Sequence, residues 1–194
     1  ATFAQRGDSH RYRGLGLPNE IFNNGQVGKL QGSLGIGCVK YANASRGGLD
    51  NVGPFFFRHH SGDFCVASDG NLVNSKQIAE YLEKRGTIFQ TDTDAELLAH
   101  LIKKSANEDR IVNIVKALNM MEGGYTFVVM TKNRIYAARD KYGIKPLCIG
   151  KIGDGYVVSS ESCAFGIMGA EFIRDVRPGE IISLDHHGIR STIF

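Results

Sequence analysis

Hydrophobic residues recur at helical spacing in the middle of the chain, and each run ends at glycine or polar residues. The first run begins at Asn74, where Gln77 three residues later resembles a capping box. Ile78 and Leu82 then form an i, i+4 apolar stripe, and Gly86 is a typical helix end. This pattern predicts a first helix.

Two more helices are expected before the pattern changes. Thr93 and Glu96 form a second possible capping box. The buried face of that helix is expected to comprise Leu97, Leu98, Leu101 and Ile102. A third helix is predicted over residues 111–121, ended by Gly123 and Gly124.

Short apolar runs with turn residues between them lie on both sides of these helices. Before them, strands are expected at residues 33–41 and 63–67, and residues 54–57 are apolar; a turn is predicted at residues 68–71. After them, residues 125–130 and 134–139 predict a hairpin, followed by strands at 156–160, 171–174 and 180–184. The first 24 residues show no clear period.

The order of elements, strands then helices then strands, limits the fold class. Hairpin-sized gaps favour antiparallel sheets, and amphipathic helices must cover a sheet face. The 194 residues suit one domain with a sizeable core. We therefore expect a layered α+β protein, although the pattern alone does not decide between three and four layers.

Composition removes several classes of function. The net charge of +3 is small and scattered along the chain, which gives no footprint for nucleic acid. No apolar run approaches the length of a membrane span. The four cysteines form no C-x-x-C pair, and the two adjacent histidine pairs are poorly spaced for chelation. We expect a cytoplasmic protein without a metal or cofactor.

Seven stretches contain residues that periodicity does not explain. They are residues 6–7, 35–41, 68–74, 93–98, 139–147 (RDKYGIKPL), 156–162 (YVVSSES) and 174–181 (RDVRPGEI). In this order and spacing they resemble the class II glutamine amidotransferase domain of the amidophosphoribosyltransferase family. The resemblance extends over nearly the whole chain.

The resemblance implies a four-layer αββα sandwich with antiparallel sheets, the fold of N-terminal-nucleophile (Ntn) hydrolases. Residues 1–194 would form a single glutamine amidotransferase domain. The family hydrolyses glutamine with an N-terminal cysteine, whose own α-amine serves as the base. The ammonia passes to a phosphoribosyltransferase domain, which makes phosphoribosylamine for purine synthesis. The expected partners are therefore glutamine or a similar amino acid and a phosphoribosyltransferase domain or chain.

Several residues fall where the family binds glutamine. Asp94 matches the residue that holds the α-amino group, and Arg6 belongs to the family's Arg-Gly motif. Lys40 replaces an arginine that clamps the α-carboxylate; lysine keeps the charge but loses the bidentate fork, so binding should weaken. Asn43 stands for a threonine and Cys38 for a histidine. These departures predict an altered substrate site.

The expected oxyanion hole is altered as well. The family uses an asparagine side chain and the N–H of the next glycine, and these positions are Asp69 and Gly70 here. An ionised aspartate offers no donor and places negative charge beside the developing oxyanion. Loss of one such donor costs about 3–4 kcal/mol of transition-state stabilisation. By contrast, Arg139-Asp140 and Arg174-Asp175 are interpreted as structural turn and ion-pair residues.

Two interpretations remain open. The sequence begins at Ala1, with Arg6 close behind, so the resemblance implies that the family's opening strand and its cysteine are absent, together with the phosphoribosyltransferase domain. One interpretation is a glutaminase domain whose opening segment is missing. The other is an inactive pseudo-amidotransferase, which serves as a binding, regulatory or assembly module. A missing strand would expose a sheet edge, which predicts pairing with another subunit in a homo-oligomer.

Overall fold

Three antiparallel sheets and five α-helices make up the described part of the chain. The computed structural model describes residues 2–4, 9–22, 25, 28, 30, 32–40, 48–105 and 109–194. The central sheet has six strands in the order β12-β11-β7-β6-β5-β4. Their bounds are β4 (Phe55–Phe57), β5 (Phe64–Leu72), β6 (Gly123–Thr131), β7 (Ile135–Arg139), β11 (Glu180–Asp185) and β12 (Gly188–Ile193).

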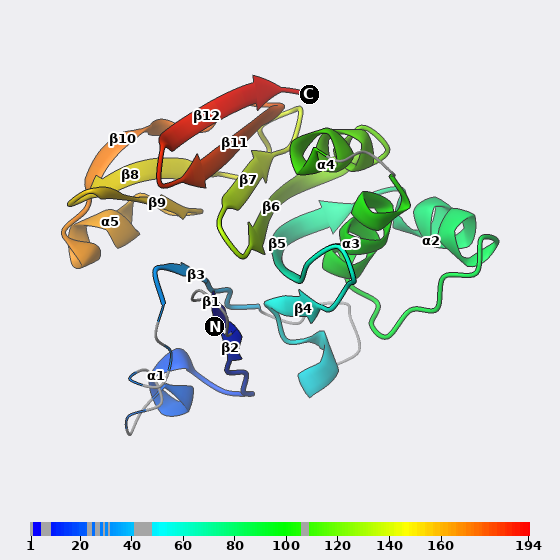
Figure 1. The fold of residues 1–194 in the computed structure, drawn as a ribbon, viewed down its shortest axis with the longest axis horizontal. Coiled ribbons are helices and arrows are strands. Elements are labelled where there is room, and N and C mark those ends of the chain that lie inside the picture. The colour runs from blue at the N-terminus through cyan, green and yellow to red at the C-terminus, as the bar shows by residue number, and fades with distance from the viewer. Residues whose placement is uncertain are drawn as a thin grey trace.

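Three helices cover one face of this sheet (Figure 1). They are α2 (Ser75–Glu83), α3 (Asp94–Lys104) and α4 (Arg110–Leu118). Side chains alternate along β5, so Phe64 and Val66 join Leu98 and Ile102 of α3 in the main core. Cys65 and Ala67 belong to a separate cluster on the opposite face. The alternation of side chains along the strand therefore gives the central sheet a separate core layer on each face.

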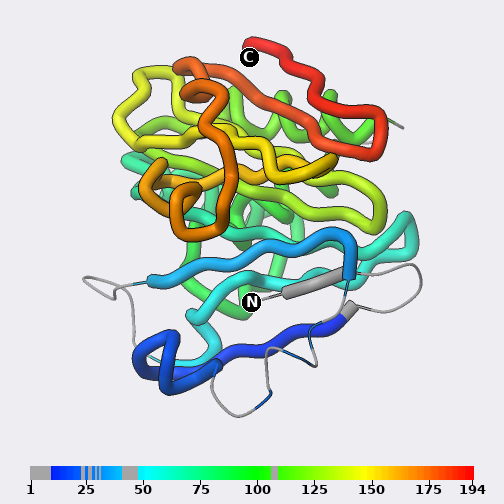
Figure 2. The backbone as a smooth tube through the Cα atoms, turned by 90° about the vertical axis from the view of Figure 1, so that its left-hand side faces the viewer, coloured from blue at the N-terminus to red at the C-terminus, as the bar shows by residue number. Residues whose placement is uncertain are grey.

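Two smaller sheets lie against that opposite face, as seen from the side in Figure 2. One has the order β10-β8-β9 and the other β2-β1-β3. Their bounds are β1 (Thr2–Ala4), β2 (Ser9–Arg11), β3 (Leu34–Ile36), β8 (Cys148–Ile152), β9 (Gly155–Ser159) and β10 (Glu171–Asp175). Ile149 of β8 packs with Ala137 and Ile182 of the central sheet, and Ile36 packs with Cys65.

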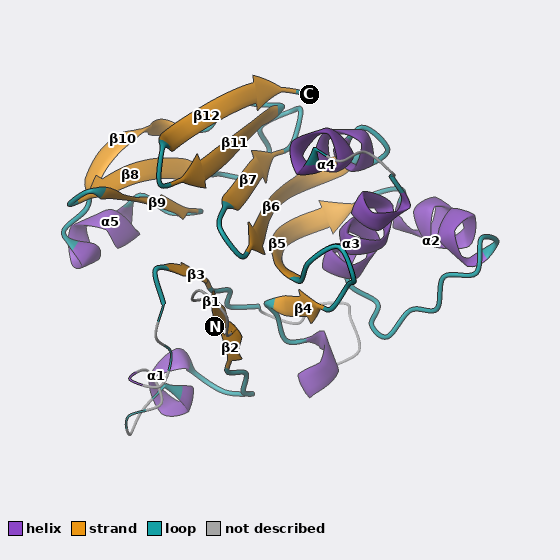
Figure 3. Cartoon of the chain, in the orientation of Figure 1, coloured by secondary structure: helices purple, strands orange, loops and turns teal. Residues whose placement is uncertain are grey.

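A further helix, α5 (Cys163–Met168), forms the fourth layer (Figure 3). Its Phe165 is 2% exposed, and a β-carbon at Gly150 of β8 would lie 3.1 Å from the Phe165 ring. The neighbouring Ile149 faces the central sheet instead, so β8 lies between a sheet and a helix. The expected α+β αββα sandwich is confirmed. Two short helices, α1 (Pro18–Ile21) and the 3₁₀ turn η2 (Leu49–Asn51), lie outside these layers.

The three long helices were predicted correctly, but the first capping box was not. The Asn74 side chain makes no cap hydrogen bond to α2. Its amide donates to the Met120 carbonyl at 2.9 Å and accepts the Glu122 N–H at 3.0 Å. Asn74 therefore fastens the start of α2 to the connection between α4 and β6.

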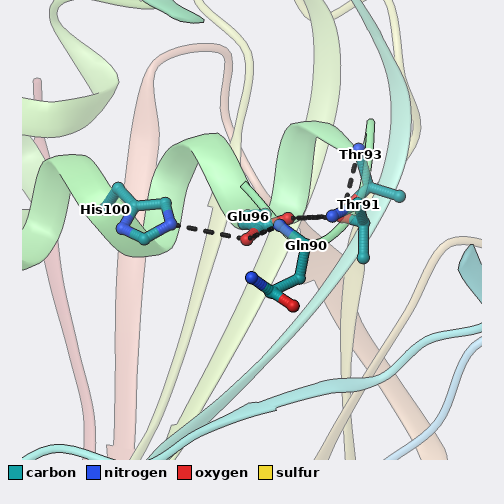
Figure 4. Close-up of polar contacts among 5 residues, drawn as sticks. All are labelled: Gln90, Thr91, Thr93, Glu96 and His100. Atoms are coloured by element: carbon teal, nitrogen blue, oxygen red, sulfur yellow. Dashed lines mark hydrogen bonds and ion pairs between the residues drawn. The ribbon is translucent and has the colours of Figure 1, made fainter. Parts of the chain in front are cut away.

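The second predicted capping box is not formed either, and Glu96 binds the loop before α3 instead (Figure 4). Thr93 makes no side-chain cap bond to α3. Glu96, 2% exposed, instead accepts the N–H groups of Gln90 and Thr91 at 2.8 and 2.6 Å. Burial opposes its ionisation, but these bonds and the His100 contact lower the pKa of Glu96. Glu96 thus stabilises the loop that precedes α3.

The predicted turn at residues 68–71 was wrong. Strand β5 continues through it to Leu72 and pairs in register with β6, so that Gly70 lies opposite Tyr125. Gly123 and Gly124 likewise open β6 rather than end a helix. Strands β1, β2, β8 and β12 and helix α5 were not predicted. The expected strand at 33–41 is reduced to β3, with residues 41–47 outside the described part.

Candidate functional site

A cleft of about 550 Å³ opens between the central sheet and the second layer. It is lined by Phe22, Gly37, Cys38, Val39, Ala67, Ser68, Asp69, Thr126, Val128, Leu147, Val158, Ser159 and Ser160. β5 supplies Asp69, β6 supplies Thr126, and the end of β9 supplies Ser159. The cleft therefore combines apolar walls with several hydroxyl groups and one carboxylate.

A smaller cavity of about 120 Å³ adjoins this cleft on the side of α1. Phe22, Cys38 and Val39 line both spaces, and Lys40 lines the smaller one. Cys38 is half-buried, and burial raises the pKa of its thiol, although the charge of Lys40 acts in the opposite direction. The residues after β3 thus form the wall between the two spaces.

Asp94 lies at the first position of α3, at the end of β5. Its Oδ2 accepts the Leu72 N–H at 3.1 Å. Burial raises the pKa of Asp94, while the Leu72 N–H and the positive charge of Lys40 oppose the increase. The charge of Lys40 therefore acts on Asp94, which makes the two predicted substrate-binding residues electrostatic neighbours.

Asp69, the predicted oxyanion-hole residue, forms an ion pair with Lys145. Its Oδ2 lies 3.2 Å from the Lys145 ammonium nitrogen. The side chains of Asp69 and Lys145 are 56% and 35% exposed, so both remain accessible from solvent. Sequence reasoning assigned Lys145 no function, although it lies within the RDKYGIKPL motif. In the sequence, 76 positions separate it from Asp69, so only the fold reveals the pair.

The loop that carries Lys145 is built around Asp140, which is completely buried. The Asp140 carboxylate accepts three backbone N–H groups, those of Tyr142, Ile144 and Lys145, at 2.9, 3.0 and 3.0 Å. A buried carboxylate with this many donors is well satisfied. These bonds determine the path of the loop between Asp140 and Lys145.

Arg139 binds the same loop from the other side. Its guanidinium donates to the carbonyls of Gly143, Lys145 and Val176 at 2.9, 2.7 and 2.7 Å. Arg174 has a comparable structural contact, a bidentate pair with Glu180 at 2.7 and 2.8 Å. The structural interpretation of Arg139, Asp140 and Arg174 is consistent with these bonds.

The N–H of Gly70 points away from β6. The carbonyl of its partner Tyr125 accepts the Asp140 N–H at 2.9 Å, on the side of β7. Gly70 and Tyr125 are therefore a pair that exchanges no backbone bonds, and the Gly70 N–H lies on the outer side of β5. The Leu72 N–H, two residues on, lies on this side as well and reaches Asp94. Gly70 thus presents a backbone donor near Asp94.

Two of the predicted substrate-binding residues, Arg6 and Asn43, lie outside the described residues. Within the described residues, no group of three or more His, Cys, Asp or Glu side chains is placed to hold a metal ion. Among the same residues, no helix has the length and apolar character needed to cross a membrane. A larger cleft of about 1110 Å³ lies at the hairpin tips near His186 and His187 and contains none of the predicted site residues.

Comparison with known proteins identifies the class. Residues 51–166, more than half of the chain, match the family model described as a glutamine amidotransferase domain. The chain belongs to this glutamine amidotransferase family and has the Ntn-hydrolase, class II fold.

Within this family, the chain is similar to amidophosphoribosyltransferases. It is 44% identical to the one from Bacillus subtilis over 94% of its own length, and 42% identical to the one from Archaeoglobus fulgidus over 89%. A solved allosteric regulatory enzyme of purine biosynthesis superimposes on 99% of the chain with a TM-score of 0.95 and 41% identity. The chain spans 39% of the length of these two curated relatives and 42% of the solved chain.

Proposed function

We propose that this domain is the glutamine-binding part of an amidophosphoribosyltransferase-like protein of purine biosynthesis, and that its hydrolytic site is degenerate. The observation that carries the proposal is the arrangement of Lys40, Asp94 and the outer edge of β5. Lys40 lines the smaller cavity, its charge acts on Asp94, and Asp94 binds the outer edge of β5 next to Asp69, which lines the cleft.

The zwitterion of an amino acid fits this arrangement. Lys40 would bind the α-carboxylate, and Asp94 would accept from the α-ammonium group. Two residues of a strand span about 7 Å, so the Gly70 N–H lies about 7 Å along β5 from the Leu72 N–H, which Asp94 binds. This distance is comparable to the length of a short side chain. An extended glutamine would therefore place its carboxamide near Gly70 and Asp69.

The degenerate character follows from Asp69. Asp69 pairs with the Lys145 ammonium group, and a carboxylate can accept but not donate. A tetrahedral oxyanion needs donors at this point, and the lost donor is worth about 3–4 kcal/mol. Lys40 and Cys38 also depart from the family's pattern; both line the smaller cavity, and Cys38 lines the cleft as well. Together these changes favour binding over hydrolysis.

An active glutaminase is the second candidate, and the retained Gly70 N–H favours it. This donor is half of the family's oxyanion hole and still faces away from β6. In that case the released ammonia would pass to a phosphoribosyltransferase domain or partner chain, as the names of the relatives suggest. The formation of a homo-oligomer remains a prediction, which light scattering that shows a monomer would contradict.

The test is calorimetric titration of L-glutamine, combined with an assay for glutamate release. We expect L-glutamine to bind and D-glutamine to bind much more weakly, with no glutamate released. Lys40→Met and Asp94→Asn should each weaken L-glutamine binding by about tenfold or more, whereas Lys141→Met, which changes the same charge outside the cleft, should not. Equal binding of both enantiomers, or none, would contradict the binding site. Glutamate release would contradict the degenerate site alone.

A further inference from the structure

We infer that the Asp69–Lys145 ion pair is the specificity determinant of this site, and that it selects an uncharged carboxamide over a carboxylate. The inference rests on the proposed amino-acid site and adds to it which side chain the ligand must carry. It assigns a ligand-recognition function to Lys145, which sequence reasoning left without one.

The pair offers one donor and one acceptor side by side. The Lys145 ammonium group donates, and the Asp69 carboxylate accepts, with 3.2 Å between their nearest atoms. A carboxamide presents the complementary set: its oxygen accepts from Lys145 and its NH₂ group donates to Asp69. Asp69 lines the cleft and both side chains are partly exposed, so a ligand beside Asp69 can reach the pair without displacing buried groups.

Lys145 is held in place by its backbone rather than by the ion pair. Its N–H donates to the buried Asp140 carboxylate at 3.0 Å, and its carbonyl accepts from Arg139 at 2.7 Å. Gly143 in the same loop has φ +67°, a conformation that side chains rarely adopt, and packs near Pro178. A partly exposed ion pair by itself contributes only about 0–1 kcal/mol to stability, so it does not account for where the loop places the ammonium group.

A carboxylate ligand would fit this pair poorly. Glutamate has no donor for Asp69 and would bring a second negative charge towards it. Recognition sites that use a donor and an acceptor together discriminate strongly against a ligand that lacks one of them. Lys145 would still attract glutamate, so we expect discrimination rather than complete exclusion, with glutamine preferred by about tenfold or more.

This mode of recognition also explains how the site can bind without hydrolysing. The pair is complementary to the planar amide of the ground state. Catalysis requires complementarity to the tetrahedral transition state instead. Asp69 stabilises the intact NH₂ group and would repel the oxyanion. Glutamine-specific binding and weak hydrolysis therefore have the same physical origin.

The experiment compares calorimetric affinities for L-glutamine and L-glutamate in the whole chain and its variants. The wild type should prefer glutamine by about tenfold or more. Asp69→Asn, which supplies a donor and removes the charge, should raise the affinity for glutamate and largely abolish the preference. Lys145→Met should lower the affinity for both ligands, and the affinity for glutamate more than that for glutamine. The matched control is Lys141→Met in the same loop, which should leave both affinities unchanged, and thermal unfolding confirms that every variant folds.

A double-mutant cycle over Asp69→Asn and Lys145→Met should be non-additive for glutamine, because the pair acts as a unit. Equal affinity of the wild type for glutamine and glutamate would overturn the inference and leave the amino-acid site intact. A preference that survives Asp69→Asn would also overturn it. If neither ligand bound, the proposed amino-acid site would be wrong as well. Asp94→Asn tests that site separately from side-chain selection, because it should weaken the binding of glutamine and glutamate equally.

Discussion

A β-carbon at Gly70 would lie only 2.2 Å from the carbonyl oxygen of Gly124. Gly70 also has φ +119°, which side-chain-bearing residues rarely adopt. Both features arise because β5 and β6 remain paired past Asp69, as far as Leu72. The close approach of two backbones therefore positions Asp69 at the cleft, next to the Gly70 N–H on the outer side of β5.

Gly70→Ala should destabilise the domain by at least about 3 kcal/mol, because the backbone strain and the collision with Gly124 add together. Gly86→Ala is the matched control. Gly86 has φ +85° but no neighbouring atom within 4 Å of a β-carbon, so it should cost only about 1 kcal/mol. Urea unfolding measures both values. If both variants lost the same free energy of unfolding, the close approach to Gly124 would not contribute to the cost of Gly70→Ala.

The same glycines show why part of the fold could not be predicted. Ser68-Asp69-Gly70-Asn71 has the composition of a turn, and nothing local distinguishes it from a strand. The distinction depends on Gly124, which is 54 residues away and provides the partner backbone. By contrast, α3 was predicted correctly because Leu98, Ile102 and their neighbours carry a helical period within one segment. Local periods are visible in a sequence, whereas partners across a sheet are not.

The site shows the same limit. Asp69, Gly70, Lys40 and Asp94 were identified from a resemblance in motifs, and in the structure the charge of Lys40 acts on Asp94. The ion pair of Asp69 with Lys145 escaped prediction, because it depends on how the loop after β7 folds around Asp140. Motifs indicate which residues matter, but contacts between distant motifs require the fold.

Glu180 should make stability depend on acid pH. Its side chain is 2% exposed, and although burial favours protonation, bonds from Arg174, Ser191 and Arg177 lower its pKa from 4.5 to about 2. Because the folded-state pKa is depressed, the stabilisation is complete above about pH 4.5 and is lost as pH falls towards 2. It should amount to on the order of 2–3 kcal/mol.

Glu180→Gln should therefore lower stability at pH 7 and flatten the decline between pH 4.5 and 2. The exposed Glu171→Gln serves as control and should change neither quantity. Urea unfolding across this pH range measures both. A parallel decline in wild type and Glu180→Gln would show that another group causes the acid sensitivity.

Asp140→Asn should destabilise the loop that presents Lys145. The substitution keeps the shape but replaces one acceptor oxygen with an NH₂ group that faces backbone donors. An unsatisfied buried donor costs about 1–3 kcal/mol. Asp154→Asn, in an exposed turn, should change stability by less than about 0.5 kcal/mol. Unfolding free energies measure the loss, and an unchanged value for Asp140→Asn would refute the bracing function of this carboxylate.

Cys38 should report occupation of the site. Among the four cysteines, Cys163 is exposed, Cys38 is half-buried, and Cys65 and Cys148 are buried. Burial raises the pKa of the Cys38 thiol, so less thiolate is available for alkylation. We expect iodoacetamide to label Cys163 first and Cys38 more slowly, and the two buried thiols only after unfolding. Peptide mass spectrometry measures each rate.

Saturating L-glutamine should slow the labelling of Cys38 but not that of Cys163, because Cys38 lines both cavities of the candidate site. The protection should disappear in Lys40→Met, which is expected to bind glutamine weakly. If glutamine slowed the labelling of Cys38 and Cys163 equally, the effect would be general stabilisation of the protein rather than occupation of the cleft. If glutamine bound by calorimetry without protecting Cys38, the ligand would have to lie elsewhere, and the assignment of the cleft beside Asp69 would be wrong.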